Sequence, residues 1–174
     1  AIMDADGNIL PRGERGEIVV QGNLVSPCYY DNPEATAEVR KFGWHHTGDV
    51  AYWDDDGYVY IVDRMKDMII TGGFNVFSAE VENAVNGHAA VENCAVIGTP
   101  DDKWGEAVTA VVMLRPGKTA TAEEIIAYAK AKIGSVKAPK RVEFWDDMPR
   151  SPVGKILKNE IRKTFWGDAE RAVN

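Results

Sequence analysis

The spacing of hydrophobic positions changes about one third of the way along the chain. Up to about residue 62, short apolar runs alternate with polar residues, which is typical of β-strands. In the run from Asp49 to Arg64, Asp56 and Gly57 lie mid-way and predict the turn of a β-hairpin. This stretch has too few apolar residues for a closed core of its own. We therefore expect a small sheet or a barrel-like lobe that packs against a larger body.

Beyond Arg64 the spacing becomes helical in places. Ser78 is a candidate N-cap for one helix, which Gly87 would end. Thr121 and Glu124 have the spacing of a capping box ahead of a second helix, which is predicted over 122–133. Both helices follow apolar runs, so strands and helices alternate in this part of the chain.

A third helix is predicted over 157–165, where Leu157, Ile161 and Phe165 recur at i, i+4 and i+8. The run 65–73 is predicted to be a strand that leads into a glycine turn, and further strands are predicted at 94–100, 107–117 and 140–145. The fold class is therefore α+β: a small β lobe followed by a compact mixed α/β domain.

Composition narrows the class of function. The chain has 174 residues and a formal net charge of −7, which argues against nonspecific nucleic-acid binding. It has no signal peptide and no apolar run long enough to cross a membrane, so we expect a cytoplasmic protein. Cys28 and Cys94 match no metal or redox spacing; buried free thiols are favoured over a disulfide. The chain starts at Ala1 within a predicted strand, which suggests a piece of something longer.

Several familiar motifs fail on inspection. Asp4, Asp6 and Asn8 begin like a calcium loop, but Ile9 stands where that loop needs glycine. The three histidines, two of them adjacent, assemble no zinc set, so no metal ligands are assigned. The letters "VGK" lack the other residues of a phosphate-binding loop.

Four patterns remain: "WHHTGDV" (44–50), "DRMKD" (63–67), "TGGFNVFSAEVE" (71–82) and "RSPVGK" (150–155). In this order the chain resembles the adenylate-forming superfamily, which includes acyl-CoA synthetases, aryl-CoA ligases, firefly luciferase and nonribosomal adenylation domains. The letters "GGFNVFSAEVE" and "RSPVGKILK" are most similar to fatty-acyl and related acyl-CoA synthetases. The resemblance covers essentially the whole chain.

The resemblance implies a domain organisation. Residues 1–63 would be the last β subdomain of a large adenylation domain, and 68–174 the mobile C-terminal domain. Residues 64–67 would form the hinge, with Lys66 as its turning residue. The missing N-terminal part is then the implied partner that holds the acid, the base of ATP and Mg²⁺.

The resemblance also assigns residues to the nucleotide. Asp49 would accept hydrogen bonds from the ribose hydroxyls, as one carboxylate can do for two donors. Arg64 would contact the nucleotide at the start of the hinge. Lys155 would be catalytic, its ammonium stabilising the charge that accumulates when a carboxylate joins the α-phosphate of ATP. Acylation of Lys155 would then switch adenylation off.

A second group of residues is assigned to CoA. Gly72 and Gly73 would let the backbone approach the pantetheine arm, with Phe74 beside it. Trp104 lies where relatives can face the nucleotide of CoA, although a packing role is equally open. Ile70 stands where luciferase-type members carry a lysine. Its presence argues against an oxidative, light-emitting activity.

The resulting hypothesis is an ATP-dependent ligase that joins a fatty or other acyl acid to CoA through an acyl-adenylate. This chain alone is predicted to be inactive. Two alternatives stay open: a ligase that delivers the acyl group to a carrier protein, and a non-catalytic α/β interaction module. The sequence does not identify the acid.

Overall fold

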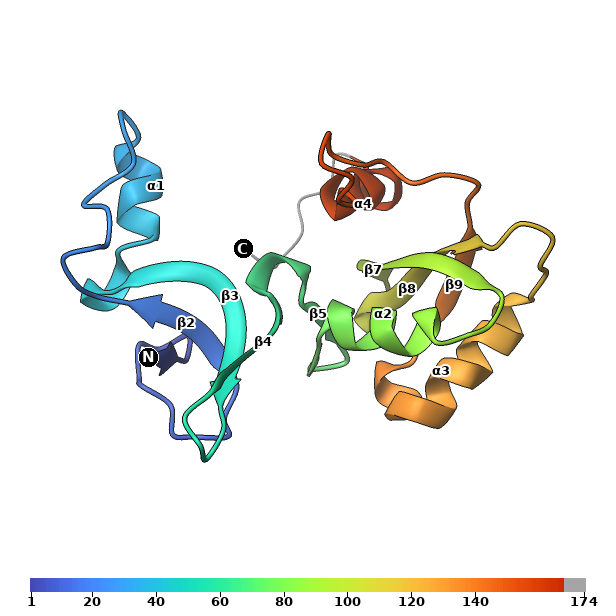
Figure 1. Cartoon of the computed structure of the whole chain (residues 1–174), viewed down its shortest axis with the longest axis horizontal. Coiled ribbons are helices and arrows are strands. Elements are labelled where there is room, and N and C mark those ends of the chain that lie inside the picture. The colour runs from blue at the N-terminus through green and yellow to red at the C-terminus, as the bar shows by residue number, and fades with distance from the viewer. Residues whose placement is uncertain (168–174) are drawn as a thin grey trace. The chain divides into compact units, whose positions relative to one another are not determined.

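The computed structural model describes residues 1–167 and divides the chain into two compact units. Unit 1 is Ala1–Met65, and unit 2 is Lys66–Asn174, of which 66–167 are described. Figure 1 shows both units along the chain, with unit 1 in blue to cyan-green.

Unit 1 is built on one antiparallel sheet in the order β1-β2-β3-β4. Its described strands do not close into a barrel, so the lobe is an open sheet and the barrel-like expectation is wrong. The predicted hairpin is confirmed, with Gly57 at φ +88° in its turn. A short helix and a 3₁₀ turn lie between β2 and β3. The elements are β1 (Ile2–Met3), β2 (Gly16–Val20), α1 (Pro33–Glu38), η1 (Lys41–Gly43), β3 (His45–Trp53) and β4 (Val59–Arg64).

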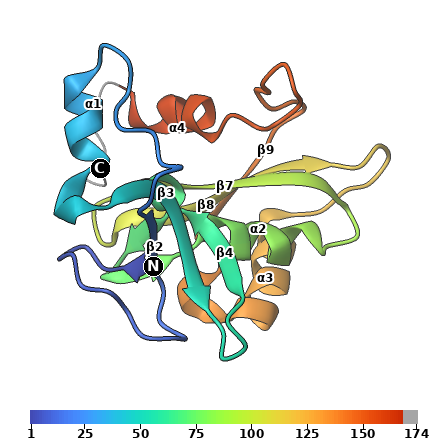
Figure 2. The same cartoon turned by 60° about the vertical axis from the view of Figure 1, so that its left-hand side comes forward.

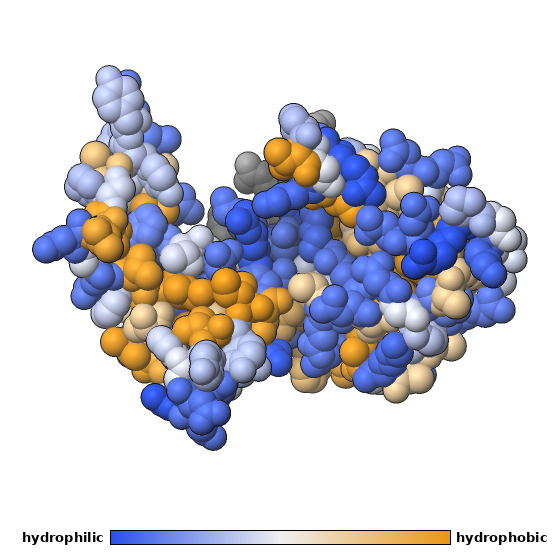
Figure 3. Space-filling view, viewed as in Figure 1, coloured by the Kyte–Doolittle hydropathy of each residue, from blue (hydrophilic) through white to orange (hydrophobic). Residues whose placement is uncertain are grey.

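Few side chains of unit 1 are buried. Its buried apolar residues are Ile2, Met3, Val19, Val50 and Ala51. Three consecutive residues of β4, Val59 to Ile61, are exposed, so both faces of this strand carry apolar surface. Figure 3 shows apolar side chains gathered on the surface of this unit. Unit 1 therefore has a thin core, as the sequence predicted.

Unit 2 contains a five-stranded sheet. Four strands follow the order β6-β5-β8-β7 with antiparallel pairing, and β9 pairs with β8 in parallel. Its central strand is β8, which pairs with β7 in a long hairpin along one edge and with β5 and β9 along the other. The strands are β5 (Ile69–Thr71), β6 (Phe74–Val76), β7 (Val91–Asp101), β8 (Gly105–Leu114) and β9 (Arg141–Phe144), preceded by η2 (Met65–Asp67). The run 65–73, predicted as a strand that runs into a glycine turn, is a 3₁₀ turn followed by a strand and the expected glycine turn.

Helices cover both faces of this sheet. The helices α2 (Ser78–Asn86) and α3 (Ala122–Lys137) pack on one face through Val81, Val85, Ile125 and Ala129. The helix α4 (Lys158–Trp166) packs on the other face through Ile161, which is fully buried. Figures 1 and 2 show α4 on the side of the sheet opposite α2 and α3. Because two separate clusters sandwich the sheet, unit 2 has a complete core of its own.

Local sequence signals predict the first residues of α2, α3 and α4 to within one residue. Thr121 and Glu124 form the expected capping box. Ser78 is not an N-cap: Phe77 holds that position, and Ser78 is a buried first helical residue. Its Oγ instead accepts a hydrogen bond from Lys158 Nζ at 2.8 Å. The hydroxyl that the local pattern assigned to an N-cap is therefore bonded to a lysine 80 residues away in the chain.

Both cysteines are free, but only one is buried. Cys94 is 4% exposed, and burial raises the pKa of its thiol, with the nearby Glu82 carboxylate adding to the effect. Cys28 is exposed, so the expectation of two buried thiols is wrong for this residue.

Candidate functional site

The structure brings Asp49 and Arg64 together on unit 1. They face each other across β3 and β4, with Arg64 Nε 3.4 Å from Asp49 Oδ1. The Arg64 side chain is 75% exposed and the Asp49 side chain 31%. Both groups can therefore contact a ligand from solvent, and an exposed pair of this kind holds itself together only weakly. A carboxylate beside a guanidinium suits a ligand that carries hydroxyls and an anionic group.

Glu17 on β2 holds the chain segment that leads into Asp49. One Glu17 oxygen accepts a hydrogen bond from Gly48 N at 2.8 Å, and the other lies 2.6 Å from His46 Nδ1. Gly48 has φ +78°, and Thr47 Oγ1 accepts a hydrogen bond from Asp49 N. Sequence reasoning missed this support. The sequence signal for it was Glu17, an acidic residue within a predicted strand, and such a signal is weak.

Lys66 lies in η2 and is exposed, and the division between the units falls between Met65 and Lys66. The next residue, Asp67, accepts a hydrogen bond from Arg162 Nη2 on α4 at 2.9 Å. The hinge role of Lys66 stays a prediction.

Gly72 and Gly73 form the two-residue turn of the β5–β6 hairpin. Their φ values are +55° and +82°, a backbone that favours glycine at both positions. Gly72 N donates a hydrogen bond to Trp104 O, and a Cβ on Gly72 would lie 2.7 Å from Trp104 Cε3. Gly72 is thus required by its φ and by the indole packed against it. Phe74 follows the turn and is 59% exposed.

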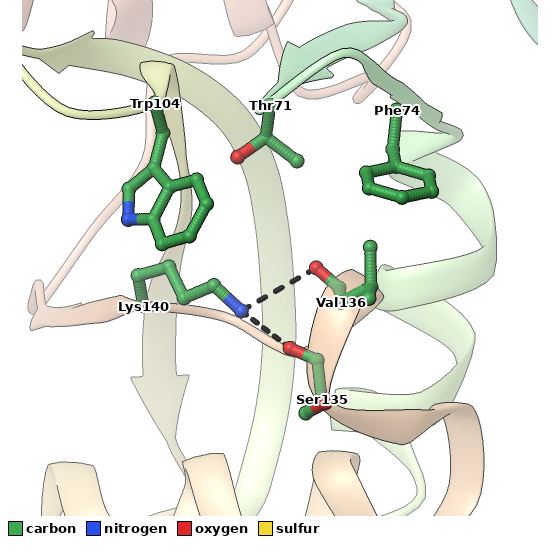
Figure 4. A pocket seen from close by; sticks show the side chains of 6 residues that line it. All are labelled: Thr71, Phe74, Trp104, Ser135, Val136 and Lys140. Atoms are coloured by element: carbon green, nitrogen blue, oxygen red, sulfur yellow. Dashed lines mark hydrogen bonds between the residues drawn. The ribbon is translucent and has the colours of Figure 1, made fainter.

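A cavity of about 280 Å³ opens beside this turn. Figure 4 shows the side chains of Thr71, Phe74 and Trp104 on one side and the end of α3 on the other. Its lining residues are Thr71, Phe74, Trp104, Ser135, Val136 and Lys140. Phe74 and Trp104 were singled out from the sequence. The α3 side was missed, because the predicted helix stopped at residue 133 while α3 continues to Lys137 beyond a non-helical Gly134.

Lys140 places a positive charge at this cavity. Its Nζ donates to the backbone carbonyls of Ser135, Val136 and Ala138 at the C-terminal end of α3. Burial, followed by repulsion from Lys130, lowers the pKa of Lys140. The cavity therefore combines apolar walls with a fixed cation, which suits an aromatic ligand that carries phosphate.

Lys155 belongs to the segment between β9 and α4, and Figure 2 shows the loop that the chain forms there. Arg150 and Ile156 pair at its base, Ser151 N donates to Lys155 O, and Lys155 N donates to Ser151 Oγ. The Lys155 side chain is exposed, and within residues 1–167 its ammonium has no protein hydrogen bond or ion pair. The loop thus fixes the lysine backbone and leaves the charge available. Among residues 1–167, no hydrogen bond or ion pair joins Lys155 to the Gly72–Gly73 turn.

The AMP-binding enzyme C-terminal domain matches residues 80–155, and Lys155 is the last matched residue. The chain is 51% identical over 159 residues to a feruloyl-CoA synthase of an Amycolatopsis species, over 91% of this chain and 32% of that protein. It is 50% identical over 180 residues to the medium/long-chain-fatty-acid–CoA ligase FadD8 of Mycobacterium tuberculosis, over 99% of this chain and 32% of that protein. The chain belongs to the adenylate-forming enzymes.

Solved structures agree with this assignment. MatB of Rhodopseudomonas palustris with ATP bound matches 97% of this chain, and 34% of MatB, at 38% identity and a TM-score of 0.88. Apo MatB matches the same share of the chain at a TM-score of 0.66. The chain spans about a third of the length of these adenylate-forming relatives and corresponds to their C-terminal portion. Among residues 1–167, no helix is long and apolar enough to cross a membrane.

Proposed function

We propose that this chain belongs to an AMP-forming carboxylate–CoA ligase and supplies the adenylation lysine, part of the nucleotide site and part of the CoA site. The observation that carries the proposal is Lys155: an exposed ammonium without a protein partner in the described chain, on an internally hydrogen-bonded loop within the family's C-terminal domain. A lysine that served only as a surface charge would need no such loop.

In the first half-reaction, an oxygen of the acid bonds to the α-phosphorus of ATP and the bond to pyrophosphate breaks. Lys155 donates hydrogen bonds to the oxygens on which charge accumulates, and this stabilises the transition state more than the separate reactants. Asp49 accepts hydrogen bonds from the ribose hydroxyls, and Arg64 offers its exposed donors to the nucleotide. The Glu17 contacts hold the backbone of that strand in place.

In the second half-reaction, the CoA sulfur bonds to the acyl carbon and the bond from that carbon to AMP breaks. The Gly72–Gly73 turn lets the pantetheine arm lie against the backbone, and Phe74 flanks it. The cavity beside the turn receives the distal part of CoA, with Trp104 and Val136 against its base and Lys140 near its phosphates. Support comes from the chemistry of the lining and from relatives named as CoA ligases.

We further propose that residues 64–67 form a hinge about Lys66 between residues 1–63 and 68–174. The two MatB structures support this proposal. They match this chain over the same share of its length but at TM-scores of 0.88 and 0.66, so they differ from each other over this region. Rotation of a C-terminal domain would let Lys155 and the Gly72–Gly73 turn act in different half-reactions.

The remaining parts of the proposal lie outside this chain. Among residues 1–167, no group of three or more His, Cys, Asp or Glu side chains could hold a metal ion, so no step is assigned here to Mg²⁺. The magnesium site, the acid pocket and the base of ATP belong to the proposed N-terminal domain. A cytoplasmic location fits the two free thiols, which a reducing compartment preserves.

The test is ATP–pyrophosphate exchange across a panel of carboxylic acids, run on this chain and on the longer protein. We expect exchange by the longer protein and none by this chain. Lys155→Ala should lower the exchange rate by about two to three orders of magnitude, in the range of losing one charge-stabilising donor. The control Lys163→Ala, which removes another exposed lysine, should retain it.

Each outcome has a meaning. Exchange by this chain alone would overturn the claim that its ATP site is incomplete. Exchange without consumption of free CoA would indicate a carrier-protein acceptor. Silence from the longer protein with every acid would favour a non-catalytic module.

A further inference from the structure

The first residue of α4 is unusual for a helix start. Its N-cap, Leu157, makes no side-chain cap hydrogen bond, and the first helical residue is Lys158. A positive charge at a helix N-terminus is opposed by the helix dipole, and Ser, Asp or Asn would satisfy the free N–H groups better. The lysine is therefore explained by something outside α4.

Lys158 reaches back to the start of α2. Its Nζ lies 2.8 Å from Glu82 Oε1 and donates to Ser78 Oγ at 2.8 Å. The same Glu82 oxygen accepts a hydrogen bond from Val96 N on β7 at 2.8 Å. The side chains of Lys158 and Glu82 are only 18% and 17% exposed. One largely buried ion pair thus joins α4, α2 and β7.

A second ion pair holds the next turn of α4. Arg162, four residues after Lys158 and on the same side of the helix, pairs with Asp67 of η2 at 2.9 Å. These side chains are 16% and 22% exposed. Two ion pairs therefore fix the rotation of α4 about its axis, while Ile161 supplies the apolar contact.

The placement of Lys155 depends on the base of its loop. The hydrogen bonds between Ser151 and Lys155 stay within the loop and cannot orient it on unit 2. On the incoming side, Met148 is buried at 2% exposure. On the outgoing side, Leu157 N donates to Pro149 O, and the next residue is Lys158.

We propose that Lys158, through its pair with Glu82, is a positioning residue for Lys155. The pair sets where α4 begins, and so where the loop before it points. It also connects that loop to α2, the helix that follows the Gly72–Phe74 segment. The inference rests on the proposed role of Lys155 in adenylation.

Electrostatics predicts a cost when only one member of this ion pair is replaced. Removing one member of a largely buried ion pair deprives the other charge of its counter-ion, and this favours movement of the chain that solvates the remaining charge. For Lys158→Met that movement involves Glu82 and the start of α4. A shift of about 1 Å in a catalytic group can cost about a hundredfold in rate.

The first arm of the test measures both half-reactions in the longer protein. We expect Lys158→Met to lower the maximal rate of ATP–pyrophosphate exchange by about 10- to 100-fold while the KM for ATP stays within about twofold. Thioester formation from supplied acyl-adenylate should change by less than about threefold, because Lys155 has no part in that step. Lys158→Arg, which keeps the charge, should restore most of the exchange.

Lys163→Met is the matched control. It removes a lysine of the same helix whose side chain is 67% exposed, and it should leave both half-reactions unchanged. An exchange rate in Lys158→Met close to wild type would overturn the proposal. So would an equal loss in both half-reactions, since that indicates general disruption of unit 2.

The second arm does not depend on activity and uses this chain itself. In hydrogen exchange, Lys158→Met and Glu82→Gln should each raise the exchange rate of amides in 150–157 by about tenfold or more, with little change in the centre of β7. Unchanged protection of 150–157 in both variants would refute the positioning role. If Lys155→Ala left adenylation intact while this arm succeeded, the proposed function would fail but the structural link would stand.

Discussion

Unit 1 and unit 2 both carry candidate site residues on their surfaces, but they differ in what lies beneath them. The Asp49–Arg64 pair of unit 1 stands on an open sheet with few buried side chains. The Lys155 loop of unit 2 is attached to a sheet with a hydrophobic cluster on each face. In unit 2 the sheet supplies its own support, whereas unit 1 leaves much apolar surface uncovered.

The exposed apolar side chains show the same contrast. In unit 2, Phe74, Trp104 and Val136 are exposed because they line the cavity. In unit 1, Val59 and Ile61 of β4 are exposed and are not among the residues that line this cavity. For these three side chains of unit 2, exposure therefore has a local explanation. In unit 1 it is consistent with a sheet that a larger body covers.

One matched pair of substitutions tests this contrast most strongly. Ile69→Ala truncates a fully buried side chain of unit 2, and we expect it to lower the free energy of unfolding by about 2–5 kcal/mol. Ile61→Ala truncates a side chain of unit 1 that is 65% exposed, and it should change that energy by about 0.5 kcal/mol or less. Denaturant unfolding by circular dichroism measures both, with hydrogen exchange to assign each change to a unit.

A loss above about 2 kcal/mol in Ile61→Ala would break the comparison. It would mean that Ile61 is covered in solution, and that unit 1 supports its own sheet.

A second pair of substitutions separates backbone strain from packing within unit 2. Gly73→Ala introduces a side chain at φ +82° with no atom within 4 Å of the new Cβ, so we expect a cost of about 1–2 kcal/mol from strain alone. Gly72→Ala adds an overlap with the Trp104 ring to similar strain and should cost about 1–3 kcal/mol more. Equilibrium unfolding measures both, and tryptophan fluorescence reports movement of the indole. Equal costs would show that Trp104 moves aside freely.

Sequence reasoning succeeded where the deciding contacts are short-range in the chain. The capping box at Thr121, the turn at Asp56–Gly57 and the glycine turn at 72–73 each depend on neighbouring residues. The Asp49–Arg64 contact also follows from a hairpin whose turn the sequence reveals. A resemblance named the role of Lys155, but no local pattern could have done so.

Contacts between distant segments were not predictable in the same way. Lys158 and Glu82 are far apart in the chain, and nothing near either residue specifies the other. The α3 wall of the cavity required knowing that the helix continues past Gly134, a residue that normally ends helices. At Ser78 the local signal predicted an N-cap, but the hydroxyl instead accepts a hydrogen bond from the distant Lys158.

The smallest expected effect compares one kind of cap in the two units. Thr121 caps α3, a 16-residue helix with buried residues, and Thr121→Ala should cost about 1 kcal/mol. Asn32 caps α1 in the same way, since its Oδ1 accepts a hydrogen bond from Ala35 N, but α1 has six residues and none is buried. Fraying of α1 exposes little new apolar surface, so Asn32→Ala should cost a few tenths of a kcal/mol at most. Thermal and denaturant unfolding distinguish the two values, and equal costs would show that α1 packs against something in solution.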